Sequence, residues 1–345
     1  MSMAYRLLDT HAHLIADDWE AYPARPFSPD LPTPGRPEYT MTAETLIALM
    51  DEHSVSHACL VQRGHVYGYD NSYIIDSARA HPGRFHPVVI LDTQDPETPA
   101  QYRRMVSESG VAGFRMANSR PWILDTAWLG SPAAIEVWRA CADLGTPMTL
   151  IVFDNQLSWV LPLVKAIARM FPDLPIILDH GAMPYGMSQY EVALREEAGE
   201  TVTMPPPPDF GIEGSVGIFE DVPNVFFKIT EINMERLVKA GQRAPHLIRR
   251  MVDTFGPDRV VWGSDIGQSM LWTYAEKVAM AVEATAWLSE EEAAKFLHDN
   301  AVRVYGLGGN GARVIRPAAR KESAERVGAD KVSADGASLR VSRAP

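Results

Sequence analysis

Residues 6–13 of the chain, RLLDTHAH, are a short apolar run that ends in two histidines separated by one residue. In an extended strand, side chains at positions i and i+2 point to the same face, about 7 Å apart along the chain. His11 and His13 therefore share one face at the end of a predicted strand. The pair alone is open to two interpretations, a metal or oxyanion site and a pair of solvated or hydrogen-bonded imidazoles.

Apolar runs of this kind recur along the chain, and each is followed by a longer amphipathic stretch. They are continuous rather than alternating, which is typical of strands buried on both faces. The alternation predicts a (β/α)8 TIM barrel, with a doubly wound sheet as the alternative. The predicted strands are YRLLDTHAHL (5–14), SHACLVQ (56–62), RFHPVVILD (84–92), VAGFRMA (111–117), PMTLIVF (147–153), PIILDHG (175–181), NVFFKIT (224–230) and RVVWGSD (259–265). The predicted helices cover 42–53, 71–81, 99–109, 132–145, 158–171 and 234–256, with Thr42 as an N-cap and Gly145 as a stop.

Two long segments interrupt the alternation, and both follow strand ends. Residues 16–40 are rich in proline, and residues 185–222 contain MPPPPDFG. Loops at the carboxyl ends of barrel strands surround the active site, so each segment is either a lid or substrate wall or a padded surface loop. We predict one barrel domain over residues 1–309. Residues 310–345 are small, polar and charged, which predicts a flexible or strap-like C-terminal extension.

The bulk composition restricts the partners. A net charge of -12 and a pI near 5.3 argue against nucleic acid and an anionic membrane, which both require a basic face. We therefore expect a small-molecule partner, and a homo-oligomer stays open. The two cysteines, Cys59 and Cys141, form no metal-binding or disulfide pattern. With no signal peptide or membrane span in the sequence, we expect a soluble cytoplasmic protein.

Polar residues follow several of the predicted strands, and in a barrel such residues meet at a common mouth. His11 and His13 follow the first strand, His180 the sixth and Asp265 the eighth. Three imidazoles and a carboxylate are suited to polarising a carbonyl and activating water, with or without a divalent ion. We predict that these four residues are catalytic. Other polar residues at the same ends are Arg115, Asp179, Lys228 and Glu231, of which the last two could form a structural pair.

Four motifs carry a resemblance to a known family: DTHAHL (9–14), ILDHGAMP (177–184), VVWGSD (260–265) and DNAVRVYG (299–306). With them the chain resembles the amidohydrolase superfamily, specifically the amidohydrolase-2 group. LVQRGHVYGYDNSYIIDSA (60–78), GVAGFRMA (110–117) and TLIVFDNQL (149–157) are most similar to the 2-pyrone-4,6-dicarboxylate lactonases of that group. The resemblance implies a hydrolase that opens a lactone, or a related ester or amide, of a carboxylated small molecule. A metal-dependent decarboxylase or hydratase of an aromatic-derived acid is the alternative, and a non-catalytic binding barrel is a third.

The resemblance leaves metal binding open. Metal-binding members usually place a histidine on the fifth strand, where this chain has Ile151. His11, His13 and Asp265 could still hold one divalent ion, most readily Zn²⁺, with His180 or water as a further ligand. The lactonases that the chain resembles work without a metal, and the missing histidine favours that version.

Both versions give Asp265 a role in moving a proton. Without a metal, Asp265 is the general base for water, and the three histidines donate to the carbonyl oxygen as it becomes an oxyanion. With a metal, Asp265 would pass the proton of water to the leaving group.

The resemblance also implies that Arg115, in GFRMA, binds a substrate carboxylate, for which a planar guanidinium is well suited. The structural alternative is an ion pair inside the barrel. Four more residues lie on loops that leave strand ends, and we predict substrate contacts for them, with simple surface placement as the alternative. They are Arg120, Tyr39, His65 and Tyr185.

Overall fold

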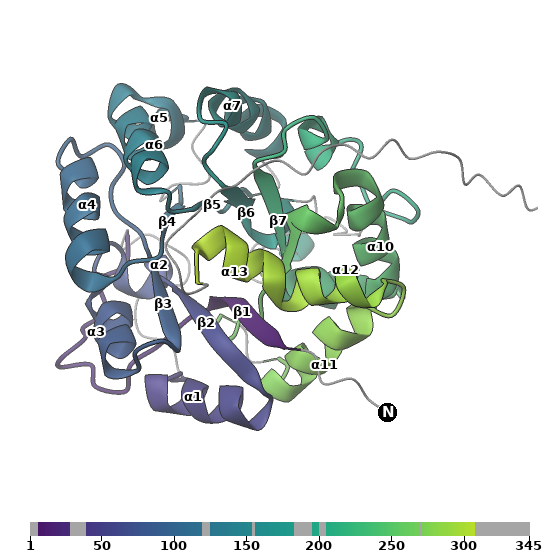
Figure 1. Ribbon diagram of the computed structural model, residues 1–345, viewed down its shortest axis with the longest axis horizontal. Helices are drawn as coiled ribbons and strands as arrows, with labels where there is room; N and C mark the ends of the chain where they lie inside the picture. Colours follow the sequence, from purple (N-terminus) through teal and green to yellow (C-terminus); the bar gives the residue numbers. More distant parts are fainter. Residues whose placement is uncertain are drawn as a thin grey trace, which may run out of the picture.

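A barrel of eight parallel strands lies at the centre of the computed structural model, which describes residues 6–27, 39–118, 125–153, 156–182, 195–199, 205–268 and 271–307 (Figure 1). The strands are β1 (Leu7–Ala12), β2 (Val55–Val61), β3 (Phe85–Val89), β4 (Gly113–Met116), β5 (Met148–Leu150), β6 (Ile176–Leu178), β7 (Val225–Ile229) and β8 (Val260–Trp262). Each strand pairs in parallel with the next in chain order, and a parallel bridge between Ala12 and Ile266 links β1 to the segment after β8. The predicted TIM barrel is confirmed, and the doubly wound alternative is wrong.

The strands are buried because both of their faces are covered. Every residue of β1, β4, β5, β6, β7 and β8 is buried, as their continuous apolar sequences predict. Three charged side chains are buried within this set: Asp9 on β1 and Lys228 on β7, both 0% exposed, and Arg115 on β4. Polar groups at this depth have few water molecules around them, so their partners decide their charge.

Helices surround the barrel and alternate with the strands (Figure 1). The Thr42 hydroxyl accepts a hydrogen bond from the Thr45 amide at 3.2 Å, and Gly145 ends a helix with a left-handed φ of 61°, which confirms both predicted helix ends. The α-helices are α1 (Ala43–Glu52), α2 (Gly64–Tyr67), α3 (Ser72–Ala80), α4 (Thr98–Ser109), α5 (Ala127–Gly130), α6 (Pro132–Leu144), α7 (Leu157–Met170), α9 (Glu231–Lys239), α10 (Ala244–Phe255), α11 (Tyr274–Ala284), α12 (Glu290–Ala294) and α13 (Asn300–Tyr305). Short segments are η2 (Asp179–Ala182), η3 (Val216–Phe219), η4 (Pro257–Arg259) and η5 (Lys295–Asp299).

The helical pattern over residues 234–256 is two helices rather than one. Gly241 interrupts it with a φ of 67°, a left-handed conformation that cannot continue a helix. Pro245, which lacks an amide hydrogen, then lies in the first turn of α10, where that hydrogen has no helical partner. The first of the two helices also begins earlier than the pattern does, because Thr230 and Asn233 form a reciprocal capping box ahead of α9.

The two long loops are described in part. In the first, the Arg25 amide donates to the Val66 carbonyl at 2.8 Å, and a Cβ added at Gly64 would lie 2.2 Å from the ring of Phe27. This loop therefore packs against α2, beside the end of β2. Of the second loop, residues 195–199 and 205–222 are described. The role of either loop as a lid stays a prediction.

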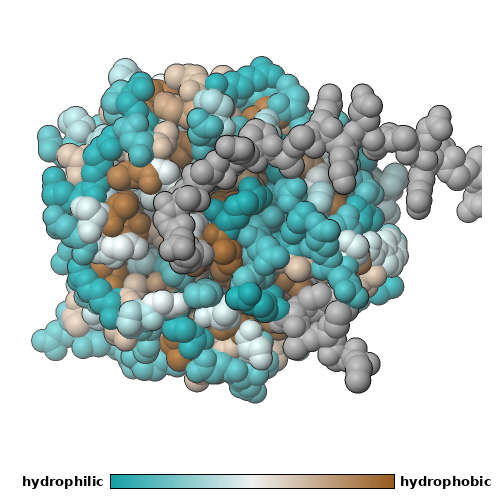
Figure 2. Space-filling model, in the orientation of Figure 1, coloured by the Kyte–Doolittle hydropathy of each residue, from teal (hydrophilic) through white to brown (hydrophobic). Residues whose placement is uncertain are grey.

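On the face shown in Figure 2, hydrophilic residues cover most of the outer helices, and hydrophobic atoms show mainly between them. Within the described ranges, no helix combines the length and the apolar character needed to cross a bilayer. The predicted extension, residues 310–345, and two of the predicted contact residues, Arg120 and Tyr185, lie outside the described residues.

Candidate active site

The seam between β1 and the segment after β8 holds the two opening histidines. The Asp265 amide donates to the His11 carbonyl at 2.7 Å, and the His13 amide donates to the Ile266 carbonyl at 2.8 Å. Glycines allow this close approach: a Cβ at Gly267 would lie 2.3 Å from the His13 carbonyl oxygen. The seam thus fixes the backbone of both histidines and of Asp265 in one frame.

The side chains of this frame face one another. His11 Nε2 and His13 Nε2 are 3.2 Å apart, and Asp265 Oδ1 lies 3.5 Å from the first and 3.2 Å from the second. Asp265 has a φ of 54°, a left-handed conformation that is strained for a residue with a Cβ. The structure therefore brings together three of the four residues predicted to be catalytic. Of these, Asp265 lies three residues beyond the end of β8.

His180 completes the group from β6. It also has a φ of 54°, its Nδ1 lies 2.7 Å from the Thr230 hydroxyl, and its carbonyl accepts from the Asn233 amide group at 2.9 Å. Ligand atoms of His180, His11 and Asp265 all lie within 4.8 Å of one another. Because the Thr230 hydroxyl already accepts from the Asn233 backbone, its proton is free to point at Nδ1. In that arrangement His180 presents an Nε2 proton to the centre of the group.

Asp179, the residue before His180, is the centre of a separate charge cluster. Its carboxylate accepts from Arg115 Nε at 2.9 Å and from Lys228 Nζ at 2.9 Å. The suggested pair between Lys228 and Glu231 is wrong, because Glu231 pairs instead with Lys277 of α11. The predicted alternative for Arg115, an ion pair inside the barrel, is present, and the same side chain also lines the cleft described below.

Burial determines the protonation of the imidazoles. It lowers the pKa of His13 to about 4, and it lowers the pKa of His11 well below its ordinary value with a further contribution from Lys228. The pKa of His180 is lowered for the same reason. For Asp265 burial raises the pKa, but the contact with His13 and attraction to His11 lower it more, so the net shift is downward. At neutral pH the site therefore holds an ionised carboxylate among neutral imidazoles.

Hydrogen bonds restrict where the protons of these imidazoles lie. His13 Nδ1 is 2.7 Å from the Val61 carbonyl, an acceptor, so the proton of neutral His13 is on Nδ1 and Nε2 presents a lone pair. His11 Nδ1 lies 3.3 Å from Lys228 Nζ, which can only donate, and 3.6 Å from Asp179 Oδ1. The shorter contact places the proton of His11 on Nε2, inside the triangle with His13 and Asp265.

The same triangle fits a metal ion. Its edges of 3.2, 3.5 and 3.2 Å compare with the roughly 3.3–3.5 Å that separates ligands about 2.0–2.2 Å from a tetrahedral Zn²⁺. Two acceptors that face each other at such distances need a proton or a cation between them. His11 suits a site with or without an ion. Without an ion, its Nε2 carries the proton between the acceptors; with an ion, that proton moves to Nδ1, toward Asp179, and Nε2 becomes a ligand. Ile151, in place of a strand-five histidine, lines the neighbouring cleft and offers no ligand atom.

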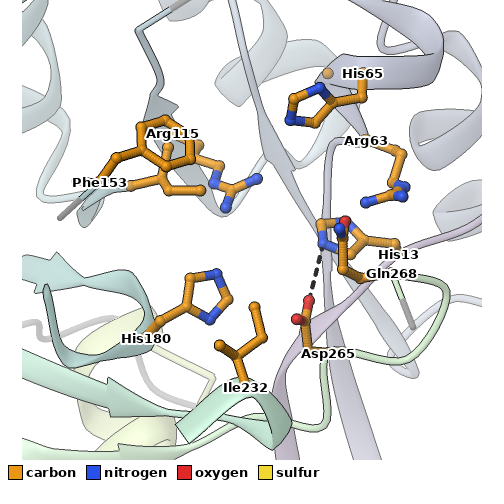
Figure 3. Close-up of a pocket in the computed structure, with 11 residues that line it drawn as sticks. His13, Arg63, His65, Arg115, Phe153, His180, Ile232, Asp265 and Gln268 are labelled. Carbon is orange, nitrogen blue, oxygen red and sulfur yellow. Dashed lines mark ion pairs between the residues drawn. The ribbon is translucent and has the colours of Figure 1, made fainter. Parts of the chain in front are cut away.

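A cleft of about 420 Å³, which includes space open to solvent, begins at this group (Figure 3). Of the residues predicted to contact substrate, His65 and Arg115 line it. Tyr39 is not among the described lining residues; its hydroxyl donates to the Gln268 carbonyl at 2.7 Å. Four further residues line the cleft whose contact was not predicted from the sequence: Arg63, Phe153, Ile232 and Gln268.

A parallel barrel with buried polar groups gathered beyond β1, β6 and β8 is the architecture of a TIM-barrel enzyme. A family model described as Amidohydrolase matches residues 8–207 and 208–307. The chain therefore belongs to the amidohydrolase family, as its motifs predicted, and it is a hydrolase of that family.

Known relatives agree with this assignment. The L-fucono-1,5-lactonase of Burkholderia ambifaria is 25% identical over 261 residues, which cover 72% of this chain and 76% of the relative. A probable 2-pyrone-4,6-dicarboxylic acid hydrolase from Acinetobacter baumannii, with citric acid bound, has a similar fold (TM-score 0.63, 18% identity, 87% of this chain and 99% of that chain). A zinc-bound amidohydrolase from Burkholderia multivorans also has a similar fold (TM-score 0.62, 19% identity, 88% of this chain and 100% of that chain). The same holds for the 2,6-dihydroxybenzoate decarboxylase from Rhizobium (TM-score 0.57, 16% identity, 88% of this chain and 98% of that chain).

Proposed function

We propose that the protein hydrolyses the lactone of a carboxylated small molecule. The observation that carries the proposal is the surroundings of Asp265. Among the described residues no lysine or arginine lies within 4.0 Å of its carboxylate, and its ion-pair contacts are with His11 and His13 alone. A buried, ionised carboxylate that no cation neutralises is able to accept a proton from water.

The remaining groups have matching roles. His180, whose Nε2 proton points into the group, donates to the carbonyl oxygen of the lactone as negative charge develops on it. The Nε2 proton of His11 lies between the two acceptors, the His13 lone pair and the Asp265 carboxylate, and neutral His13 presents no proton to the substrate. This differs from the expectation that all three imidazoles donate, because the Val61 carbonyl takes the His13 proton. Arg115 presents the part of its guanidinium that Asp179 does not use to a substrate carboxylate.

A divalent ion would be held by His11, His13 and Asp265, with His180 or water as a further ligand. When bound, it would polarise the carbonyl and lower the pKa of water. The Asp265 carboxylate and the His180 imidazole border the cleft in either case. The zinc bound in the Burkholderia multivorans relative supports testing this ion first.

The direct test is to assay purified protein with L-fucono-1,5-lactone and 2-pyrone-4,6-dicarboxylate. The substrates are taken from the relatives, and one acid group is released for each ring opened. We expect acid release in a pH-stat without formation of carbon dioxide, since water attack on a lactone yields only the hydroxy or keto acid. Release of carbon dioxide from 2,6-dihydroxybenzoate, with no lactone opened, would establish the decarboxylase alternative, which the Rhizobium relative favours.

Metal content is measured on the same preparation. Stoichiometric zinc by elemental analysis, together with activity that a chelator removes and zinc restores, would assign the ion. Activity that survives removal of all bound metal would assign the reaction to the side chains alone. Binding of an organic acid without any turnover would leave the third alternative, a non-catalytic barrel.

A further inference from the structure

Arg63 is a buried cation on the cleft that no carboxylate neutralises. The residue is 8% exposed, and its Nε has no hydrogen-bond partner in the part of the chain that the structure describes. No described aspartate or glutamate lies within 4.0 Å of its guanidinium. Burial lowers its pKa, which reflects the free-energy cost of an incompletely paired charge. A site that retains such a charge gains when an anion enters it.

The charges around the cleft show what is missing. Of the described residues that line the cleft, Arg63 and Arg115 are positive, Asp265 is negative, and the imidazoles of His13, His65 and His180 are neutral. The next carboxylate, Glu231, is neutralised by Lys277. The group therefore carries one positive charge in excess, although the whole chain has a net charge of -12. One ligand carboxylate would balance it.

Neighbouring groups orient the guanidinium of Arg63 in the cleft. Tyr39 accepts a hydrogen bond from Arg63 and donates its own proton to the Gln268 carbonyl at 2.7 Å. Figure 3 shows the guanidinium groups of Arg63 and Arg115 directed into the cleft from opposite sides, above Asp265 and His180. Phe153 and Ile232 supply apolar lining of the same cleft. A flat ring with a carboxylate at one edge matches this arrangement of charge and apolar surface.

We propose that Arg63 determines specificity by binding, together with Arg115, the single carboxylate of a monoanionic ring substrate, with Tyr39 as its positioning residue. The inference rests on the proposed lactone hydrolysis for the reaction but not for the binding. It assigns Tyr39 a role behind the cleft, and it adds to Arg115 a second cation that the sequence analysis did not consider. An uncharged sugar lactone would leave the Arg63 charge unbalanced, so it should be the poorer ligand.

The test uses calorimetric titration with furan-2-carboxylate and its uncharged amide, two ring ligands that water does not open. The full-length protein should bind the carboxylate about 10- to 100-fold more tightly than the amide, as expected for a hydrogen-bonded charge in a buried site. Arg63→Gln should reduce this preference to within about twofold, and Arg63→Lys should keep part of it. Arg25→Gln, which removes an exposed arginine paired with Asp70, is the matched control and should change nothing.

Thermal unfolding separates binding from structure. If Arg63 serves a ligand, Arg63→Gln keeps or raises the melting temperature, because it removes an unbalanced buried charge. A lowered melting temperature, equal affinity of the wild type for acid and amide, or no binding of the acid would each overturn the proposal. Lactone turnover is measured separately. If Arg63→Gln loses the preference for the acid but the wild type opens no lactone, the hydrolase proposal is refuted and the anion site stands. If the wild type opens lactones but Arg63→Gln keeps the preference, the anion site is refuted and the hydrolase proposal stands.

Discussion

The ends of β6 and β8 each place a buried aspartate in the barrel, and the two differ in what surrounds them. Asp179 accepts from Arg115 and Lys228, both at 2.9 Å, whereas Asp265 contacts the imidazoles of His11 and His13. For Asp179 burial raises the pKa, but the two cations hold it well below its ordinary value. Two cations pair with the Asp179 carboxylate, whereas no described cation pairs with the Asp265 carboxylate, which can therefore accept a proton. We therefore expect the same residue type to serve structure at one strand end and, as proposed, chemistry at the other.

The sharpest test of this contrast is Asp265→Asn. Removing the base should lower kcat by about 10²- to 10⁴-fold, and the fold should be kept because no cation loses its partner. Steady-state kinetics with a lactone substrate, alongside circular dichroism, measure both. A variant with wild-type turnover would remove Asp265 from the mechanism, and Asp51→Asn on the exposed end of α1 is the control.

The matching substitution at the end of β6 is Asp179→Asn, which should mainly lower the free energy of unfolding. Two buried cations would lose their carboxylate, which costs about 3–5 kcal/mol of unfolding free energy. Urea titration measures this cost. Asp221→Asn, at an exposed ion pair with Lys165 and Arg169, should cost far less, because water screens an exposed pair. Equal midpoints for the two variants would show that the β6 cluster is not structural.

Exchanging the proposed oxyanion donor, His180→Ala, should lower kcat by about 10²- to 10³-fold with a smaller change in KM. The reason is that a donor aimed at developing charge acts mainly in the transition state. Thr230→Val, which removes the hydroxyl that orients His180, should reproduce a smaller part of the loss. A change confined to KM would identify His180 as a ground-state contact instead.

A further expected effect is a dependence of stability on pH. The pKa of His13 falls to about 4 and that of His65 to about 3 through burial, while both would be near 6.5 when unfolded. Between these values the unfolded chain binds more protons, so stability falls as the pH drops from about 6.5 toward 4. Urea midpoints at pH 7, 5.5 and 4.5 measure the slope. His65→Gln should reduce it, and a flat profile would contradict the assigned neutral imidazoles.

The order of strands and the positions of His11, His13, His180 and Asp265 were predictable from sequence because both depend on local patterns. Continuous apolar runs mark buried strands, and polar residues just beyond them mark the mouth of a barrel. The catalytic roles of these residues stay predictions.

The pairing of charges was not predictable from the same patterns. Which cation reaches Asp179 depends on how far neighbouring strands are staggered around the barrel, and neither Lys228 nor Glu231 reveals this in its own segment. Arg63 follows β2 by two residues and satisfies the strand-end rule, so that signal was available. Arginine is usually a surface residue, so its place after a strand does not by itself predict a buried side chain. Tyr39 contacts the loop after β8 instead of lining the cleft, since a loop residue's direction is set by tertiary contacts.

The bridge from Ala12 to Ile266 has a consequence for how the enzyme comes into being on the ribosome. His11 and His13 are among the first residues to be synthesised, and Asp265 follows only after the eighth strand is complete. A nascent or prematurely terminated chain therefore carries these imidazoles but neither Asp265 nor Ile266, the residue that bridges back to Ala12. The proposed site can form only after translation has passed residue 266.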